Sequence, residues 1–257
     1  MKFENRLVVI SSGTKKYLSV ITQGQEFITN EGKIEFDQIV QIPIDIKSST
    51  GKVFTVYSPS YSEFVLLMKR GPQIIYPKDV GSIIVSANIN SESKVLEIGT
   101  GSGALTLFLV SLLGPNAKYY SVDVNKKNQY RAKKTISRYL SSYSSDFHKE
   151  VNFINKDLID FSIDSIPFNF DSIITDVPEP WLFFENNQIK TDMHWVSYLP
   201  SISQVSKIAD SLKKNDFKDI VIKEVLEREW NINGKILRPK HSMVGHTGFI
   251  VSGRYII

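Results

Sequence analysis

The 257-residue sequence contains no cysteine, which excludes disulfide bonds, thiolate chemistry and cysteine-based zinc sites. Its four histidines are scattered and form no His-x-x-x-His pair, so we predict that the protein holds no metal. No apolar run approaches the roughly 18 residues that a membrane-spanning helix needs, and the N-terminus lacks the apolar core of a signal peptide. These absences predict a cytoplasmic protein that works without a metal and without a membrane.

The composition that remains is that of a folded, mildly basic protein. Hydrophobic residues make up 42% and charged residues 23% of the chain, which is ordinary for a globular domain. The net charge of +4 permits nucleic-acid binding but does not demonstrate it, because a binding face needs clustered charge. The densest basic cluster lies on a helix expected from residue 126 to 143, where a solvated helix face is the simpler explanation.

The sequence pattern changes near residue 65. Residues 1–65 alternate short β-type runs with turn pairs such as Gln23-Gly24 and Glu31-Gly32, which predicts a small all-β, barrel-like N-terminal domain. Residues 66–257 alternate strand and helix patterns, which predicts a mostly parallel sheet with right-handed crossovers. A final strand pair, expected within residues 217–230 and 244–257, would give this sheet an antiparallel edge. The predicted fold class is therefore α/β and Rossmann-like, with a small N-terminal β domain.

A glycine turn lies at the centre of the second region. Lys94–Ile98 is a short apolar run that predicts a buried parallel strand, and residues 104–113 form a helical pattern that ends at Gly114-Pro115. Between them, Gly99-Thr100-Gly101-Ser102-Gly103 lets the backbone turn tightly and approach a ligand closely. Strand, glycine turn and helix together form the opening half of a nucleotide-binding unit.

The residues around this turn favour one cofactor over another. Dinucleotide loops and S-adenosyl-L-methionine loops both have such glycines, and a purely structural turn is the simplest alternative. Glu97 gives the Glu-x-Gly-x-Gly-x-Gly form that is typical of class I methyltransferases. Asp123 ends the next strand, about 20 residues on, where an acid holds the ribose hydroxyls. Asp157 ends the following strand and is expected to bond the adenine amino group.

The substrate side of the site is predicted at the end of another strand. Asp176 closes the strand 170–176 and is followed by a Pro-x-Pro bend and Trp181, which offers a flat apolar face. A related (Asp/Asn)-Pro-Pro-aromatic bend occurs in enzymes that methylate the amino group of adenine in DNA, although here the prolines are separated. Because parallel strands end at one crevice, we expect Asp176 to lie beside the glycine turn.

A loop before the glycine turn supplies further candidates. Tyr76 and Lys78 form a pair suited to stacking on a base and contacting a phosphate, although a buried tyrosine under a tight loop explains Tyr76 equally well. Pro77 between them favours an extended backbone at Tyr76. Asp79 is expected to cap a helix over residues 80–87.

In these segments the sequence resembles the tRNA (adenine-58-N1) methyltransferases, in the single-subunit form found in archaea and bacteria. The matching segments are residues 75–79, 95–107, 176–181, 198–205, 224–230 and 244–250. The resemblance implies a homotetramer, a cytoplasmic location, S-adenosyl-L-methionine as methyl donor and the T-loop of tRNA as target. Some archaeal members also modify the neighbouring adenine 57, and the resemblance leaves open whether this chain does. Without cysteine, the tetramer would depend on packing and charge pairs.

The resemblance also implies roles for single residues. Asp176 falls where the family has its catalytic aspartate. The cofactor contacts fall on Glu97, Gly99, Thr100, Gly101, Ser102, Gly103, Ala104, Leu105, Asp123, Asn128, Asp157 and Asp176. The substrate contacts fall on Tyr76, Lys78 and Trp181. The family position that matches Asn128 is variable, and Asp123 stands where a longer Glu is common.

Three other functions remain as alternatives at this stage. A class I methyltransferase acting on another RNA, on DNA adenine, on a protein or on a small molecule would keep the same glycine turn and Asp123. A nicotinamide enzyme would bind a dinucleotide, and the spacing of Glu97 argues against it. A catalytically silent RNA-binding subunit would be expected to have lost the glycine turn and Asp176, and both are present.

Overall fold

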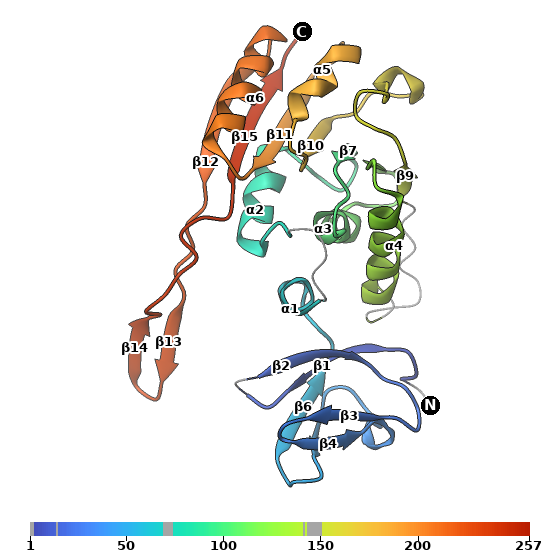
Figure 1. Cartoon of the computed structure of the whole chain (residues 1–257), viewed down its shortest axis with the longest axis vertical. Helices are drawn as coiled ribbons and strands as arrows, with labels where there is room; N and C mark the ends of the chain where they lie inside the picture. Colours follow the sequence, from blue (N-terminus) through green and yellow to red (C-terminus); the bar gives the residue numbers. More distant parts are fainter. Residues whose placement is uncertain (1–2, 14, 69–73, 141, 143–150) are drawn as a thin grey trace. The chain divides into compact units, whose positions relative to one another are not determined.

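The computed structural model describes residues 3–13, 15–68, 74–140, 142 and 151–257 (Figure 1). These residues form two compact units, one from the described residues within 1–71 and 133–149, the other from those within 72–132 and 150–257. In this described part of the chain, no helix is long and apolar enough to cross a membrane.

The first unit is built mainly from β-strands. Its strands are β1 (Leu7–Ser11), β2 (Lys16–Val20), β3 (Glu26–Thr29), β4 (Gly32–Glu35), β5 (Ile44–Lys47) and β6 (Val53–Tyr57). Four of them form an antiparallel sheet in the order β2-β1-β6-β5, and β3 with β4 forms a separate hairpin. Ile10, Ile34 and Phe54 are fully buried in one core that the sheet and the hairpin share. The predicted N-terminal β region is therefore confirmed, with β5 as a strand that the sequence analysis did not anticipate.

Two short helical segments also belong to this unit. They are the 3-10 helix η1 (Phe36–Gln38) and the helix α1 (Tyr61–Leu67). α1 begins with a capping box, in which the Ser60 hydroxyl accepts from the Glu63 backbone N–H and the Glu63 carboxylate accepts from the Ser60 N–H.

The second unit is organised by a seven-stranded sheet. Its strands are β7 (Lys94–Ile98), β8 (Lys118–Val122), β9 (Asn152–Ile154), β10 (Ser172–Thr175), β11 (Met193–Leu199), β12 (Lys218–Glu224) and β15 (Phe249–Tyr255). They lie in the order β12-β15-β11-β10-β7-β8-β9. The five strands from β11 to β9 are parallel, whereas β15 is antiparallel to both β11 and β12. The predicted α/β fold, mostly parallel with an antiparallel edge, is confirmed.

The helices of this unit follow the predicted alternation. They are α2 (Pro77–Ser86), α3 (Ala104–Leu112), α4 (Lys126–Leu140), α5 (Phe183–Asn186) and α6 (Ile202–Lys214), with the 3-10 helices η2 (Ile163–Ser165) and η3 (Pro180–Leu182). Only residues 126–132 of α4 belong to this unit, since residues 133–140 are counted with the first. α6 forms where predicted because Val205, Ile208, Ala209 and Leu212 recur at helical spacing and are buried on one face. α3 is apolar almost all round and is correspondingly buried on most sides.

One prediction about the C-terminal part is wrong, and one strand is additional to the prediction. Residues 244–257 do not form a hairpin; their one strand, β15, inserts between β11 and β12 instead. The strand β11 beside it was not predicted. A hairpin does form earlier, from β13 (Trp230–Asn233) and β14 (Ile236–Pro239), and it makes a two-stranded sheet of its own. Figure 1 shows this hairpin projecting from the end of the seven-stranded sheet, and we call residues 226–245 the arm.

The strand order fixes where a ligand is expected. The chain passes from β7 outward to β8 and β9, then returns to the other side of β7 with β10 and β11. Such a reversal leaves a crevice at the carboxyl ends of the two central strands, here β7 and β10, where open α/β sheets bind their ligands.

Candidate active site

Backbone hydrogen bonds continue past the strand ends and align three loops. The Asp176 N–H donates to the Ile98 carbonyl (2.8 Å), the Gly99 N–H to the Val122 carbonyl (2.8 Å) and the Asp123 N–H to the Ile154 carbonyl (3.1 Å). Asp176, Gly99 and Asp123 are therefore held in a row at the ends of β10, β7 and β8.

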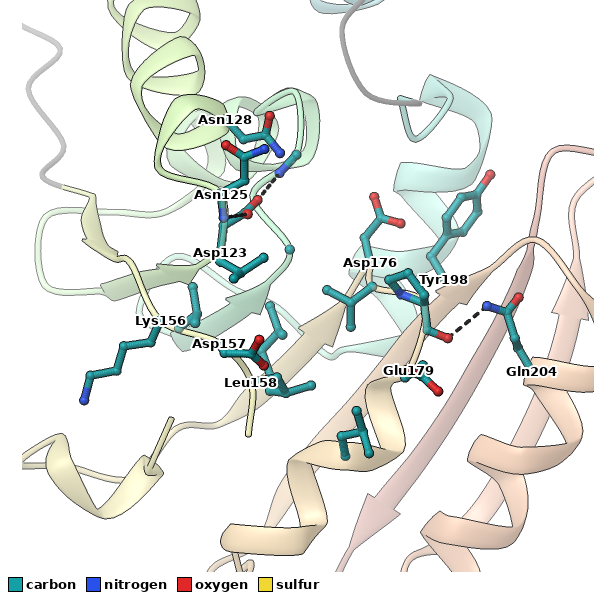
Figure 2. A pocket seen from close by; sticks show the side chains of 18 of the residues that line it. Asp123, Asn125, Asn128, Lys156, Asp157, Leu158, Asp176, Glu179, Tyr198 and Gln204 are labelled. Carbon is teal, nitrogen blue, oxygen red and sulfur yellow. Dashed lines mark hydrogen bonds between the residues drawn. The ribbon is translucent and has the colours of Figure 1, made fainter. Parts of the chain in front are cut away.

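A pocket of about 580 Å³ opens at this row, which is large enough for a nucleoside-sized cofactor (Figure 2). Six of the residues predicted for the site line it: Gly99, Gly101, Asp123, Asn128, Asp157 and Asp176. The other lining residues are Ile74, Ile98, Val122, Val124, Asn125, Lys156, Leu158, Val177, Pro178, Glu179, Leu182, Tyr198, Pro200 and Gln204. The structure thus gathers the acids that follow three strands, β8, β9 and β10, around one cavity.

The glycine turn needs glycine at specific positions. Gly99 and Gly103 have φ angles of +97° and +79°, which side chains rarely adopt. A Cβ on Gly99 would overlap the carbonyl group of Asp176, and a Cβ on Gly103 would lie 2.7 Å from the Cβ of Ala132. Gly101, with φ of +51°, has no heavy atom within 4 Å of its would-be Cβ, so open space lies above the middle of the turn.

Asp123 organises the cofactor side of the pocket. Its Oδ2 accepts from the Gly101 N–H (3.0 Å) and its Oδ1 accepts from the Asn125 N–H (2.7 Å). A carboxylate has about four acceptor positions, so both oxygens retain capacity for further donors such as ribose hydroxyls. The side chain therefore fixes the glycine turn and can hold a ligand at the same time.

Glu97 has a different place from the one predicted. It is 1% exposed and does not line the pocket. Its Oε2 accepts from the hydroxyls of Thr106 (2.7 Å), Tyr119 (2.7 Å) and Ser121 (2.6 Å), and the Ser121 hydroxyl lies 2.6 Å from that of Thr100. Burial raises the pKa of Glu97 to about 7. Glu97 thus supports the turn from behind, and its direct contact with the cofactor stays a prediction.

Asp176 is the unusual acid of the site. Its side chain is half-buried and, within the described part of the chain, has no hydrogen-bond partner. Burial raises the pKa of Asp176 to about 7, with a further contribution from the negative charges of Glu97 and Asp123. Figure 2 shows Asp176 between Asp123 on one side and Tyr198 on the other. A desolvated carboxylate that faces a pocket without a partner is a strong candidate for a functional group.

The bend after Asp176 is fixed by contacts beneath it. The side chain of Gln204 donates to the carbonyl of Pro178 (2.9 Å), and the Thr175 hydroxyl donates to the Ser197 hydroxyl (2.8 Å). These contacts hold the ends of β10 and β11 together at the substrate side of the pocket.

The three residues predicted to contact the substrate do not line this pocket. Trp181 packs half-buried against the core of the sheet, with Lys207 Nζ 5.0 Å from the centre of its ring. Tyr76 is half-buried at the N-cap of α2. Lys78 already donates to three acceptors within the protein, so the predicted phosphate contact of its ammonium is not supported. Asp79 lies in the first turn of α2 and does not cap it, because this helix begins at Pro77.

The remaining predicted residues belong to the turn and to α3. Thr100, Ser102, Gly103, Ala104 and Leu105 do not line the pocket, although they shape the backbone beside it. No group of three or more His, Asp and Glu side chains suited to a metal occurs among the residues that the structure describes.

The most informative residue that the sequence analysis missed is Tyr198. It lies near the end of β11 and is the aromatic side chain that lines the pocket beside Asp176. The signal was available, because the residues 198–201 follow the same strand-end rule as Asp123 and Asp176. Tyr198 could not be placed by this rule, because the sequence does not predict β11 as a strand.

Comparison with known proteins identifies the family. Residues 52–241 match the family model described as the tRNA methyltransferase complex GCD14 subunit. The chain belongs to this family. The tRNA (adenine(57)-N(1)/adenine(58)-N(1))-methyltransferase TrmI of Methanocaldococcus jannaschii is 32% identical, with 98% of this chain and 95% of the relative aligned. TrmI of Thermus thermophilus, named as a tRNA (adenine(58)-N(1))-methyltransferase, is 27% identical over 93% of this chain and 92% of its own length.

Solved structures agree with this membership in the GCD14 family. The tRNA (m1A58) methyltransferase TrmI from Aquifex aeolicus has a TM-score of 0.78 and 30% identity, covering 99% of this chain and 98% of that structure. An S-adenosylmethionine-dependent O-methyltransferase from Thermotoga maritima has a TM-score of 0.89 at 22% identity, covering 98% of this chain and 94% of the other. At that identity the second likeness concerns the fold alone, which is the methyltransferase fold.

Proposed function

We propose that this protein transfers a methyl group from S-adenosyl-L-methionine to N1 of adenosine 58 in the T-loop of tRNA. The observation that carries the proposal is the carboxylate of Asp176, which has no hydrogen-bond partner among the described residues and is held at the end of β10 beside the glycine turn of a GCD14-family chain. The relative from M. jannaschii is named for positions 57 and 58, and the one from T. thermophilus for position 58 alone. We propose position 58 as the main target and leave position 57 to the experiment.

The pocket matches S-adenosyl-L-methionine in its hydrogen-bond acceptors and apolar walls as well as in its size. Asp123 has acceptor capacity for the ribose hydroxyls, and Val124 with Leu158 offers apolar walls for an adenine ring. Asp157 lines the same end and can accept from the exocyclic amino group. The open space above Gly101 is where the methionine part would pass. An Asp123→Ala variant should bind the cofactor about ten- to hundredfold more weakly, the loss typical of hydrogen bonds to a charged group.

When bound, the cofactor supplies a methyl group on a sulfonium, which is already a good leaving group. The N1 lone pair of adenine forms the new N–C bond while the S–C bond breaks, so no base needs to remove a proton from N1 first. Positive charge then spreads over the adenine ring and its amino group. The Asp176 carboxylate would accept the amino N–H and stabilise this charge, a contribution aimed at the transition state.

Tyr198 offers the second contact for the target base. Its ring lines the pocket beside Asp176, where it can provide the aromatic contact that the sequence predicts for Trp181 or Tyr76. Stacking on an aromatic side chain is the usual way to hold a base that has been turned out of a folded nucleic acid. We propose that the target adenine lies against Tyr198 with its amino group toward Asp176.

The proposal also includes an oligomeric state and a location in the cell. The family resemblance supports a homotetramer acting in the cytoplasm. Ile232, Ile236 and Leu237 of the arm are 76%, 62% and 65% exposed, and such an apolar surface supports self-association. Light scattering on a sizing column gives the mass directly, and a monomer at micromolar concentration would exclude the tetramer.

The experiment that tests the function measures tritium transfer from labelled S-adenosyl-L-methionine to an unmodified tRNA transcript, followed by nucleoside analysis. We expect 1-methyladenosine, and we expect it to be lost when adenine 58 is replaced. Label that persists until adenine 57 is also replaced would add the second position. Cofactor binding without any label in tRNA would favour the alternative, a class I methyltransferase with another substrate.

A further inference from the structure

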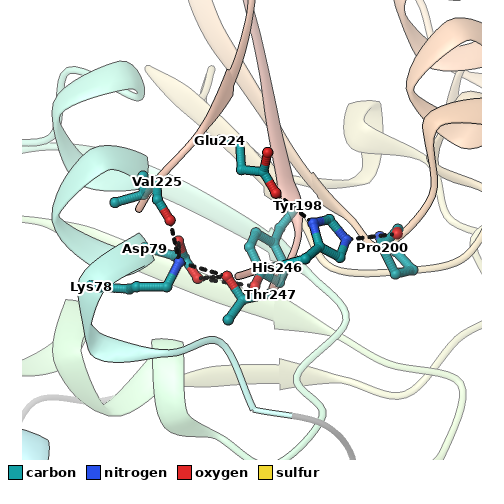
Figure 3. Close-up of polar contacts among 8 residues, drawn as sticks. All are labelled: Lys78, Asp79, Tyr198, Pro200, Glu224, Val225, His246 and Thr247. Atoms are coloured by element: carbon teal, nitrogen blue, oxygen red, sulfur yellow. Dashed lines mark hydrogen bonds and ion pairs between the residues drawn. The ribbon is translucent and has the colours of Figure 1, made fainter. Parts of the chain in front are cut away.

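The two ends of the arm meet in one buried polar cluster. Lys78 Nζ donates to the carbonyl of Val225, which precedes the arm (2.6 Å), and to the hydroxyl of Thr247, which follows it (2.7 Å). These residues are 147 and 169 positions away from Lys78 in the sequence. Figure 3 shows both contacts converging on the first turn of α2.

Asp79 completes the cluster. Its Oδ1 accepts from Lys78 (2.7 Å), and its Oδ2 accepts from the hydroxyls of Thr247 (2.7 Å) and Tyr198 (3.1 Å). Asp79 is fully buried, Thr247 is 5% exposed and the Lys78 side chain is 8% exposed. All three ammonium hydrogens have acceptors and both carboxylate oxygens have donors, so the cluster is fully satisfied.

The cluster also reaches the wall of the pocket. The hydroxyl of Tyr198 is fixed by Asp79, while its ring packs flat against Gly248, where a Cβ would lie 2.5 Å from the ring. Next to it, His246 Nε2 lies 3.1 Å from the carbonyl oxygen of Pro200, a second residue of the pocket wall, and its Nδ1 lies 2.6 Å from Glu224. The Tyr198 ring is thus held directly by Asp79 of α2 and by Gly248 after the arm, and Val225 before the arm joins this cluster through Lys78.

We propose that Lys78, Asp79 and Thr247 are positioning residues for methyl transfer, which hold the Tyr198 ring at the substrate side of the pocket and connect that wall to the arm. The proposal rests on the function proposed above. A buried ion pair is often no more stabilising than apolar residues of the same volume. Its presence here is therefore better explained by the orientation it imposes on Tyr198 than by stability.

The first test compares Thr247→Val with Thr247→Ser. Valine keeps the volume but removes the hydroxyl that links Lys78 to Asp79, so we expect kcat with tRNA to fall about ten- to hundredfold, as for a misplaced catalytic contact. The affinity for S-adenosyl-L-methionine should stay within twofold, because its predicted contacts lie at Asp123 and the glycine turn. Serine restores the hydroxyl and should restore most of the rate.

A matched control and a milder variant accompany this pair. Thr55→Val removes a similar hydrogen bond, from the Thr55 hydroxyl to Asp45 (2.7 Å) in the first unit, and should leave kcat and cofactor affinity unchanged. If Thr247→Val does not fold, Tyr198→Phe removes only the hydroxyl that contacts Asp79. The phenylalanine variant should lower kcat in the same direction with unchanged cofactor affinity.

A second readout does not depend on methyl transfer. Hydrogen exchange followed by mass spectrometry should show faster exchange of residues 197–201 and of residues 225–247 together in Thr247→Val. Wild-type rates and exchange in this variant would overturn the proposal, and so would a parallel loss of rate and cofactor affinity. If the wild-type protein does not methylate tRNA while exchange changes as expected, the proposed function fails and the structural connection stands.

Discussion

Gly99 and Asp176 are so close that a side chain on one would displace the backbone of the other. A Cβ on Gly99 would lie 2.9 Å from the carbonyl carbon of Asp176 and would overlap its carbonyl oxygen. The glycine that opens the cofactor turn is therefore also what permits the candidate catalytic aspartate to sit beside that turn.

Replacing Gly99 should lower both the stability of the fold and the rate of methylation. Gly99→Ala is expected to lower the free energy of unfolding by more than Gly101→Ala, which suffers the strain of a positive φ, about 1–2 kcal/mol, without a backbone clash. It should also shift Asp176 and lower the methylation rate. Thermal unfolding and steady-state rates of the two variants measure this, and equal destabilisation would contradict the role of the close approach.

Asp176 should affect the chemical step and not cofactor binding. Asp176→Asn and Asp176→Ala are expected to lower kcat by about 10²–10³, the usual cost of removing a group that stabilises developing charge. Calorimetric affinity for S-adenosyl-L-methionine should be retained, since the hydrogen bonds proposed above for the cofactor come from Asp123 and Asp157 and not from Asp176. Near-wild-type turnover in Asp176→Ala would exclude the catalytic role.

The pH dependence follows from the pKa of Asp176. The proposed role requires the carboxylate, and burial together with Glu97 and Asp123 raises this pKa to about 7. We therefore expect kcat/KM to rise with pH through about 7, and Asp176→Asn to remove that limb. Glu97→Gln is the matched control, because the pKa of Glu97 is also about 7 but this acid does not face the pocket. Loss of the limb in the Glu97 variant alone would mean that Glu97, and not Asp176, is the titrating acid.

The raised pKa values of Glu97 and Asp176 predict that the folded state is less stable at higher pH. A carboxyl whose pKa is raised by folding stabilises the folded state below its unfolded pKa, and this contribution is lost as the pH rises through about 7. For Glu97 the raised pKa corresponds to about 3 kcal/mol. Denaturant unfolding across this range should show a smaller decline in Glu97→Gln than in the wild-type protein.

The exposed basic residues of α4 should contribute to tRNA affinity. Lys127 and Arg131 are one turn apart and exposed on a helix that begins beside the pocket residues Asn125 and Asn128. Replacing both by Glu should weaken tRNA binding and lower the slope of affinity against salt by about 2, or about one for each phosphate that the helix no longer neutralises. Lys213→Glu with Lys214→Glu, at the end of α6, changes the charge equally and should leave that slope unchanged. An unaltered slope in the α4 variant would make its basic face a solvated surface.

Much of the site was predictable because its signals are local. The glycine turn, the helices α3 and α6, and the acids at the ends of β8 and β10 each follow from the type and spacing of neighbouring residues. Parallel strands then bring those acids to one edge without further information. The pocket lining of Gly99, Asp123 and Asp176 is the result.

The parts that were missed depend on distant residues. β11 was hidden because His194 and Ser197 interrupt its apolar run, although Ser197 is fully buried and hydrogen-bonded to Thr175 and Trp195. Lys78 was assigned to a phosphate because lysine is usually a solvated cation, and its partners follow it by 147 and 169 residues. No local pattern indicates that such a lysine is buried.

The position of β15 has a consequence for how the chain is made. β12 contacts the rest of the seven-stranded sheet only through β15, which is synthesised after it and inserts between β12 and β11. On the ribosome, β11 must therefore remain an open edge, and β12 an unpaired strand, until residues 249–255 have emerged. Such an edge is a ready template for pairing with another nascent chain. If translation stalls within the arm, the strands that form the pocket have already been synthesised. The sheet then lacks β15, and β11 remains an exposed edge.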